Sequence, residues 1–117
     1  MEKFVVITYL FDFYQELLTD KQRDLLRGYY FEDFSLSELA EQHQISRQSA
    51  FDTIKKAEHK MLDYEQHLGL FDKYKTTEKS LAEIKLLCEK LSAKLDGDNK
   101  DSVSEITTIV NQLLSNI

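Results

Sequence analysis

The side chains of this chain that are best suited to chemistry gather in one short stretch, residues 47–60. Arginine and glutamine stand at its start, and both can pair with the hydrogen-bonding edges of guanine and adenine in the major groove of duplex DNA. Lysines follow, and lysine binds phosphate groups as a point charge. Four basic residues and two acids give the stretch a net charge of +2. The candidate DNA-contacting residues are Arg47, Gln48, Ser49, Phe51, Asp52, Lys55, Lys56 and Lys60.

Two of these candidates, and the charge of the whole chain, limit what kind of DNA binding is expected. Asp52 is repelled by phosphates, although a carboxylate can accept a hydrogen bond from cytosine N4. Phe51 could touch a thymine methyl group, pack under a neighbouring element or form a protein contact. The formal net charge is −6, which is the wrong sign for a protein that coats nucleic acid without sequence preference. We therefore expect any DNA contact to be local and salt-sensitive.

Other chemistries have weaker support in the sequence. His59, Asp63 and His67 recur every four residues, but on a helix the two histidines would lie about 12 Å apart along the axis, too far to share one metal ion. Cys88 stands in an apolar stripe with no histidine nearby, which predicts a buried thiol and not a nucleophile. No glycine-rich phosphate loop or catalytic constellation is visible among the 117 residues. We expect no enzyme activity, no cofactor and no metal.

The elements that position the candidate residues follow from helix caps. Ser35 and Glu38 form a capping-box pattern, which predicts a short helix from Leu36 to about residue 43. Ser46 is a further N-cap, and it predicts a long helix that begins at Arg47. The inward side of this long helix is expected to consist of Ala50, Ile54, Ala57 and Met61.

The corner between these two helices has the composition of a helix-turn-helix. Ala40 is a small residue where the second helix must cross the first, and Ile45 is an apolar residue that can plug the corner. Gln44 occupies the position that needs positive φ, where glycine is usual. A non-glycine residue there costs on the order of 1 kcal/mol. Two helices that merely meet at a corner would share this spacing, but the basic outward side of the second favours a DNA-binding motif.

The rest of the chain also predicts helices. One is expected from about Phe4 to Leu18, and a second begins after a capping box at Thr19 and Gln22. We interpret most of residues 28–34 as an aromatic-rich loop. The long helix should end near Gly69, and Thr76 or Thr77 should cap the next one. A turn is predicted at residues 96–99, and a last helix from about Ser102.

Composition and apolar spacing set the fold class and the domain organisation. The chain has no proline and three glycines, and 42% of its residues are hydrophobic, which indicates an all-α fold with a real core. We predict a helix-turn-helix domain over residues 1–70 and a C-terminal helical hairpin over residues 71–117. Two apolar stripes of this hairpin could pack on each other or on a second subunit. They are Leu81, Ile84, Cys88, Leu91 and Leu95, and Ile106, Val110, Leu113 and Ile117.

These patterns resemble one known protein family over roughly residues 10–70. Residues 18–22, 29–30, 35–41, 45–50 and 54–58 look like the YlxM family, small bacterial proteins whose helix-turn-helix is similar to region 4 of sigma factors. The resemblance implies Arg47, Gln48, Ser49 and Asp52 at the DNA-facing start of the recognition helix, with Lys55 and Lys56 near phosphates. It also implies a link to the signal recognition particle pathway, because the family's gene lies beside those of the particle's GTPases.

Two functions from different classes follow. The first is a helix-turn-helix regulator of transcription that binds duplex DNA as a homodimer joined through its C-terminal helices. The second is a protein-interaction adaptor of the signal recognition particle system that does not bind DNA, which the acidic balance, Asp52 and Phe51 favour. Either would be cytoplasmic, because the single cysteine excludes an internal disulfide framework and no apolar run approaches the roughly 20 residues of a membrane span.

Overall fold

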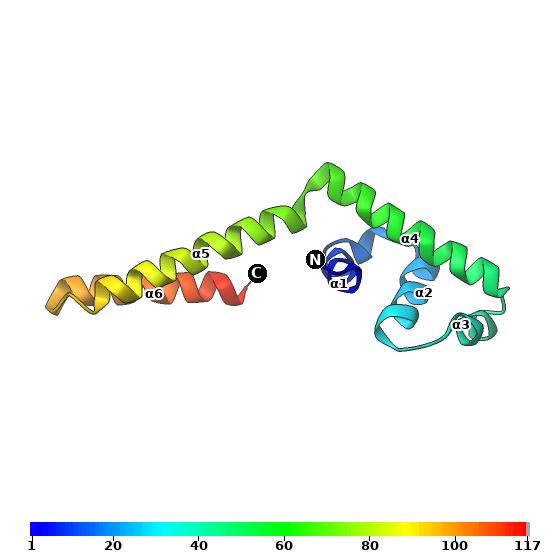
Figure 1. Ribbon diagram of the computed structural model, residues 1–117, viewed down its shortest axis with the longest axis horizontal. Helices are drawn as coiled ribbons and strands as arrows, with labels where there is room; N and C mark the ends of the chain where they lie inside the picture. Colours follow the sequence, from blue (N-terminus) through cyan, green and yellow to red (C-terminus); the bar gives the residue numbers. More distant parts are fainter. Residues whose placement is uncertain (117) are drawn as a thin grey trace. The chain divides into compact units, whose positions relative to one another are not determined.

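The computed structural model describes residues 1–116, and all regular structure in that range is helical (Figure 1). The predicted all-α class is therefore confirmed. The chain forms two compact units, residues 1–71 and 72–117, and each is described by itself. The elements are α1 (Lys3–Tyr14), a single 3-10 turn η1 (Gln15–Leu17), α2 (Asp20–Phe31), α3 (Leu36–Gln42), α4 (Arg47–Leu68), α5 (Leu70–Ser92) and α6 (Gly97–Ser115).

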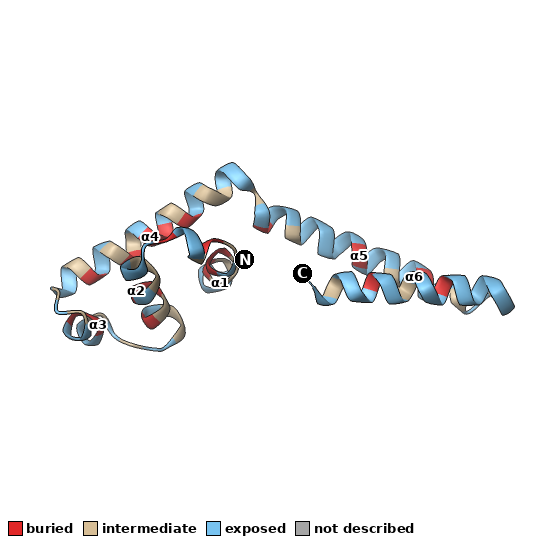
Figure 2. Ribbon diagram, turned by 180° about the vertical axis from the view of Figure 1, so that it is seen from behind, coloured by how far each residue is buried: buried red, intermediate tan, exposed pale blue. Residues whose placement is uncertain are grey.

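The long helix α4 is the backbone of the first unit. Helices α1, α2 and α3 all contact it, and their buried residues lie on the sides that face it (Figure 2). The four inward positions predicted for α4, namely Ala50, Ile54, Ala57 and Met61, are all buried. The apolar period of 3.6 residues thus predicts correctly which side of α4 forms the core.

The helix-turn-helix has its own core cluster. Leu25 from α2, Leu39 from α3 and Ile54 from α4 are buried together. Gly28 allows α2 and α3 to approach closely, because a Cβ atom placed there would lie 2.6 Å from a methyl carbon of Leu39. Tyr30, Phe34, Leu36 and Ile45 pack around this cluster.

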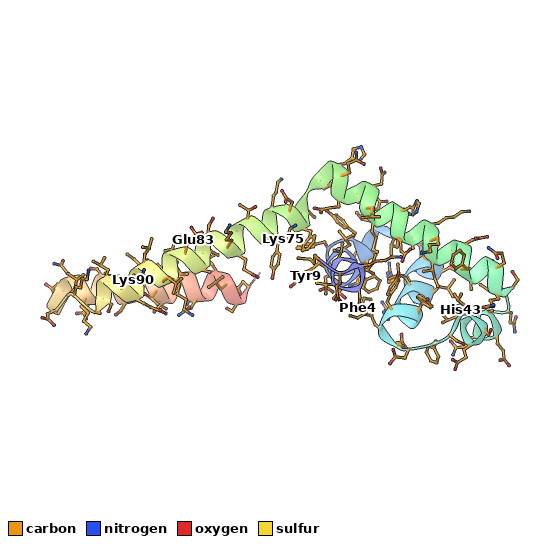
Figure 3. The ribbon with its side chains drawn as sticks, viewed as in Figure 1. Phe4, Tyr9, His43, Lys75, Glu83 and Lys90 are labelled. Carbon is orange, nitrogen blue, oxygen red and sulfur yellow. The ribbon has the colours of Figure 1, made fainter. Side chains whose placement is uncertain are left out.

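The aromatic run after Gly28 is more helical than expected. The prediction of a loop over most of residues 28–34 is wrong, since α2 continues to Phe31. The aromatic side chains favour this continuation because Phe31 packs on Phe11 of α1, with ring centroids 5.2 Å apart, and also on Phe4 (Figure 3). The chain leaves the helix at Asp33, which has a left-handed φ of 58°.

The start of α5 also differs from the expectation of a threonine cap at residue 76 or 77. Gly69 ends α4 as predicted, with a left-handed φ of 63°, but α5 begins immediately, at Leu70. Its first amides are satisfied by side chains from other helices. The N–H of Leu70 donates to the Tyr14 hydroxyl (3.2 Å), and the N–H of Phe71 donates to Glu65 (3.0 Å). These long-range acceptors replace the local cap.

The second unit is a hairpin of α5 and α6, which lie alongside each other (Figures 1 and 2). Leu81 and Cys88 of α5 and Val103 and Val110 of α6 are buried. Helix α6 begins at Gly97, about one turn before the predicted Ser102. Asp96 occupies the N-cap position without a side-chain capping hydrogen bond, and Asp98 in the first turn complements the positive end of the helix dipole.

Each apolar stripe expected along the hairpin is divided between two faces. Ile84 and Leu91 are 41% and 49% exposed, although they belong to the same predicted stripe as the buried Leu81 and Cys88. On α6, Ile106 and Leu113 are likewise exposed, and Ile117 lies outside the described residues. A two-helix hairpin has only one internal seam, so it cannot cover every apolar position of two wide stripes.

None of the helices in the described part of the chain has the length and apolar character needed to cross a membrane.

Candidate nucleic-acid interface

The two caps of the helix-turn-helix form as predicted. The hydroxyl of Ser35 accepts the N–H of Glu38 (3.1 Å), and the carboxylate of Glu38 accepts the N–H of Ser35 (3.0 Å). These hydrogen bonds from the Ser35 backbone and side chain lower the pKa of the Glu38 carboxyl. The hydroxyl of Ser46 accepts the N–H of Ser49 (3.0 Å) and fixes the start of α4. The caps therefore set the residue at which each helix begins.

The corner itself adopts the predicted left-handed turn. Gln44 has φ 54°, and the next amide, that of Ile45, donates to the carbonyl of Ala40 at 2.9 Å. Ile45 is half-buried against the core cluster. The turn delivers the first residues of α4 to the surface while Ala50 remains in the core. Arg47 and Gln48 are consequently both exposed.

Gln48 is held by its neighbour on the next turn. Its amide nitrogen donates to a carboxylate oxygen of Asp52 at 2.9 Å. This bond orients the Gln48 amide and offsets part of the negative character of Asp52. The pair still presents an amide oxygen, a second N–H and a free carboxylate oxygen, so Gln48 and Asp52 together offer donors and acceptors to a ligand.

A shallow groove lies where α3 and α4 begin, and we call it the α3–α4 groove. It is lined by Leu36, Arg47, Gln48 and Phe51. Phe51 is 40% exposed and Leu36 is half-buried. Sequence reasoning assigned Leu36 to the core alone, and its share in the groove follows from its position in the first turn of α3 next to the start of α4. The groove combines an apolar floor with two polar side chains, and none of its four lining residues is acidic.

The three candidate phosphate-binding lysines differ in their surroundings. Lys56 is exposed. Lys60 is half-buried, with its ammonium 3.5 Å from the amide oxygen of Gln22. Lys55 lies 5.5 Å from the centre of the Phe51 ring and forms an ion pair with Glu58 at 3.3 Å. Of the three, Lys56 has the freest access to a phosphate, and the charge of Lys55 is partly used inside the protein.

Glu58 is a feature that sequence reasoning missed, since it was counted only as one of the acids of the helix. Its side chain is only 4% exposed. It accepts a hydrogen bond from the hydroxyl of Tyr30 and pairs with Lys3 (3.4 Å) as well as Lys55. We call these four residues the Glu58 cluster. The available signal was spacing, because residue 58 lies four positions after Ile54 and three before Met61, at the border of the buried side.

The Glu58 cluster keeps its carboxylate ionised. Burial raises the pKa of Glu58, but the hydrogen bonds from Tyr30 and Lys55 and the charge of Lys3 outweigh that effect, so the pKa lies below its ordinary value. Burial, reinforced by the bond to Glu58, raises the pKa of the Tyr30 hydroxyl. The cluster thus joins α1, α2 and α4, and it pairs the buried Glu58 carboxylate with two lysine ammonium groups.

Of the other chemically interesting residues, His59 lies beside the candidate DNA-contacting residues, in a shallow pocket that Asp52, Lys55 and Lys56 also line. His59 and His67 are exposed, and the ring of His67 contacts the backbone oxygen of Asp63 at 2.8 Å. Cys88 is buried between α5 and α6, as interpreted from its stripe. Within residues 1–116, no group of three or more histidine, cysteine, aspartate or glutamate side chains is arranged to hold a metal ion.

Comparison with known proteins agrees with this geometry. Residues 1–109 match the family model UPF0122, described as "Putative helix-turn-helix protein, YlxM / p13 like". A UPF0122 protein of Oceanobacillus iheyensis is 47% identical over 87 residues, which cover 74% of this chain and 83% of the relative. A UPF0122 protein of Listeria welshimeri is 42% identical over 100 residues, 86% of this chain and 90% of the relative.

The match extends beyond the helix-turn-helix itself, since residues 1–109 include α1, the whole of α5 and most of α6. Both the sequence resemblance and the helical architecture of the described residues therefore support the same family assignment. The chain belongs to the UPF0122 family of YlxM/p13-like helix-turn-helix proteins.

Proposed function

We propose that this protein is a cytoplasmic regulator of transcription that binds duplex DNA through the first turns of α4. The observation that carries the proposal is the exposure of Arg47 and Gln48 at the start of the second helix of a capped helix-turn-helix. In this motif the N-terminal part of the second helix enters the major groove. Side chains there can reach base edges, whereas those further along meet the phosphate backbone.

The proposed base contacts follow from hydrogen-bonding geometry. Arg47 would donate two hydrogen bonds to guanine O6 and N7, and Gln48 would pair with adenine N6 and N7. The bond between Gln48 and Asp52 restricts the glutamine amide before DNA arrives, which reduces the ordering cost on binding. Asp52 keeps one oxygen that can accept from cytosine N4.

The proposed phosphate contacts are fewer than the number of lysines suggests. Lys56 is the main candidate because it is exposed, and Lys60 would join it at the edge of the site. Lys55 would contribute only as far as Glu58 leaves its charge uncompensated. Ser49 supplies its backbone amide to the cap, so a phosphate contact would have to come from its hydroxyl. With so few contacts the affinity should be modest and should fall with salt.

We further propose that the protein acts as a homodimer joined through its second unit. Helix-turn-helix proteins that bind as dimers read two half-sites, one with each protomer. The helix-turn-helix of the second protomer would add the DNA affinity that a single modest contact surface lacks. The hairpin of α5 and α6 leaves apolar side chains exposed that a second subunit could cover.

The second candidate function is a protein-interaction adaptor in the signal recognition particle pathway. The α3–α4 groove favours it, because Leu36 and Phe51 give this groove an apolar floor suited to a protein side chain. The ion pair between Lys55 and Glu58 favours it as well, since it diverts positive charge from the surface.

Selection from a random pool of short DNA duplexes at two salt concentrations would decide between these functions. Enrichment of a motif, retained at physiological salt, is the expected result. A pool that remains random, or binding that disappears at physiological salt, would contradict DNA reading. Binding of purified signal recognition particle protein after nuclease treatment would then support the adaptor.

A further inference from the structure

The hairpin of the second unit has two apolar stripes on each helix. The first stripe faces the other helix and is formed by Leu81 and Cys88 on α5 and by Val103 and Val110 on α6, all buried. The second stripe has members spaced three and four residues apart and is exposed. It consists of Ile84, Leu87 and Leu91 on α5, and of Ile106, Ile109 and Leu113 on α6, each 41–63% exposed.

The two exposed stripes lie on one face of the hairpin. The opposite face is marked by a shallow groove between the helices, lined among others by Glu89 and Ser92 of α5 and by Lys100 and Ser104 of α6. At about 100° per residue, these groove residues are rotated to one side of the buried stripe on each helix. The exposed stripes are rotated to the other side on both helices. They therefore combine into one surface, which we call the six-residue face.

The size of the six-residue face is that of a protein interface. Six half-exposed leucine and isoleucine side chains leave on the order of 500 Å² of apolar surface, near the upper end of the largest patch on an ordinary monomer. A standard stable interface buries about 800 Å² on each partner, including its polar rim. A surface of this kind, built from two antiparallel helices, is half of a four-helix bundle.

The charges that border the face are complementary to each other. The outer edge of α5 is net basic and that of α6 is acidic, and all of these residues are exposed. Figure 3 labels Glu83 and Lys90 along α5. The α5 edge carries Lys79, Glu83 and Lys90 and is continued by Lys94 in the turn that follows, and the α6 edge carries Asp98, Asp101 and Glu105. An α5 edge would be repelled by another α5 edge and attracted by an α6 edge.

We infer that a second copy of this chain covers the six-residue face, with α5 of each protomer beside α6 of its partner. The two-fold axis that relates the protomers then runs parallel to the helices. The hairpin turns of both protomers lie at the same end of the resulting four-helix bundle. Only this arrangement places Lys90 and Lys94 of one protomer near Asp98 and Asp101 of the other. The inference rests on the homodimer proposed above and specifies its surface and its pairing.

Sedimentation equilibrium of the full chain tests the surface. The Leu87→Glu, Ile109→Glu variant introduces charge on the six-residue face, and the Ala93→Glu, Ser104→Glu variant introduces the same charges on the opposite face. We expect the wild-type protein and the opposite-face variant to be dimers at micromolar concentration and the face variant to be a helical monomer. A wild-type monomer would overturn the homodimer itself. A face variant that remains dimeric would overturn only the assigned surface.

Charge reversal tests whether α5 lies beside α6 of the partner, and it leaves the apolar face unchanged. It therefore remains informative if the Leu87→Glu, Ile109→Glu variant fails to fold. Lys90→Glu with Lys94→Glu should raise the dimer dissociation constant roughly tenfold at low salt. Adding Asp98→Lys and Asp101→Lys in the same chain should return the dissociation constant to its wild-type value. If α5 instead packed antiparallel on α5 of the partner, the hairpin turns would lie at opposite ends and Lys90 would approach Lys79 of the partner subunit. The first pair of changes would then replace a repulsion by an attraction and lower the dissociation constant. Binding of DNA that contains a single half-site is measured separately. It tests the proposed DNA-binding function whatever the outcome of the dimer experiments.

Discussion

The ammonium of Lys55 lies 3.3 Å from a carboxylate oxygen of Glu58, one turn further along α4. Glu58 is buried, and its charge is shared with Lys3 and the Tyr30 hydroxyl. Lys55 of the proposed recognition helix is therefore tied to a buried carboxylate. In the proposal, Arg47 and Gln48 make the base contacts and Lys55 is a secondary phosphate contact.

Replacement of Glu58 by glutamine should lower the stability of the protein and change its pH dependence. The folded-state pKa of Glu58 is below its ordinary value, so its ionisation stabilises the fold at neutral pH, and that contribution is lost as the pH falls below about 4.5 toward the folded-state pKa. We expect Glu58→Gln to reduce the free energy of unfolding by about 1–2 kcal/mol at pH 7.

Urea denaturation at pH 7 and at pH 3.5 would measure this effect. The difference between wild type and Glu58→Gln should shrink at the lower pH. Glu41→Gln, at an exposed glutamate of α3, provides the control. A stability difference for Glu58→Gln that is the same at both pH values would show that ionisation of this carboxylate contributes nothing.

Gly28→Ala should destabilise the helix-turn-helix even though alanine is the better helix former. The added Cβ would lie 2.6 Å from a methyl carbon of Leu39, which forces α2 and α3 apart at their contact. Overpacking of this kind costs about 1–3 kcal/mol. Thermal unfolding followed by circular dichroism would detect it. Gly28→Ala combined with Leu39→Ala should recover part of the loss, whereas equal stability of Gly28→Ala and wild type would contradict the close approach.

The α3–α4 groove should recognise a thymine methyl group if the protein reads DNA. Leu36 and Phe51 line its apolar part, and apolar contact with the C5 methyl is one way in which proteins select thymine. In a selected duplex, replacement of the contacted thymine by uracil removes only this methyl. Fluorescence anisotropy should show weaker binding by a few-fold for the wild type and equal binding of both duplexes by Phe51→Ala. A wild-type protein that binds both duplexes equally would assign Phe51 to another role.

Lys56 should account for more of the salt dependence of DNA binding than Lys55. Each phosphate contact contributes about 0.9 to the slope of log K against log salt. Lys56→Ala should reduce the slope by about that amount, and Lys55→Ala should reduce it less, because Glu58 already compensates part of the Lys55 charge. Titrations at four salt concentrations would give both slopes. A larger change for Lys55→Ala than for Lys56→Ala would reverse this assignment.

Features encoded by neighbouring residues were predictable from the sequence. The caps at Thr19, Ser35 and Ser46 form as expected because each needs only a side chain and an amide three residues away. The left-handed conformation of Gln44 followed from its place in the motif. These local signals fix the boundaries of α2, α3 and α4 at their N-terminal ends, and with them the positions of Arg47 and Gln48.

Features that depend on distant partners were not predictable. Helix α5 begins at Leu70 because Tyr14 and Glu65 supply acceptors from other helices, and no local residue signals this. Glu58 is buried because Tyr30 and two lysines meet it, one of them near the N-terminus. The division of each hairpin stripe into a buried and an exposed part depends on how α5 and α6 pack, which periodicity alone does not specify.

The most direct test of DNA reading compares wild type with the double variant Arg47→Ala, Gln48→Ala. Each protein is titrated by fluorescence anisotropy, at physiological salt, with the duplex enriched in the selection and with a scrambled duplex of the same composition. We expect the wild type to prefer the enriched duplex by at least tenfold and the double variant to bind both duplexes equally, with unchanged helix content. A double variant that retains the preference would show that the first turn of α4 does not read the bases.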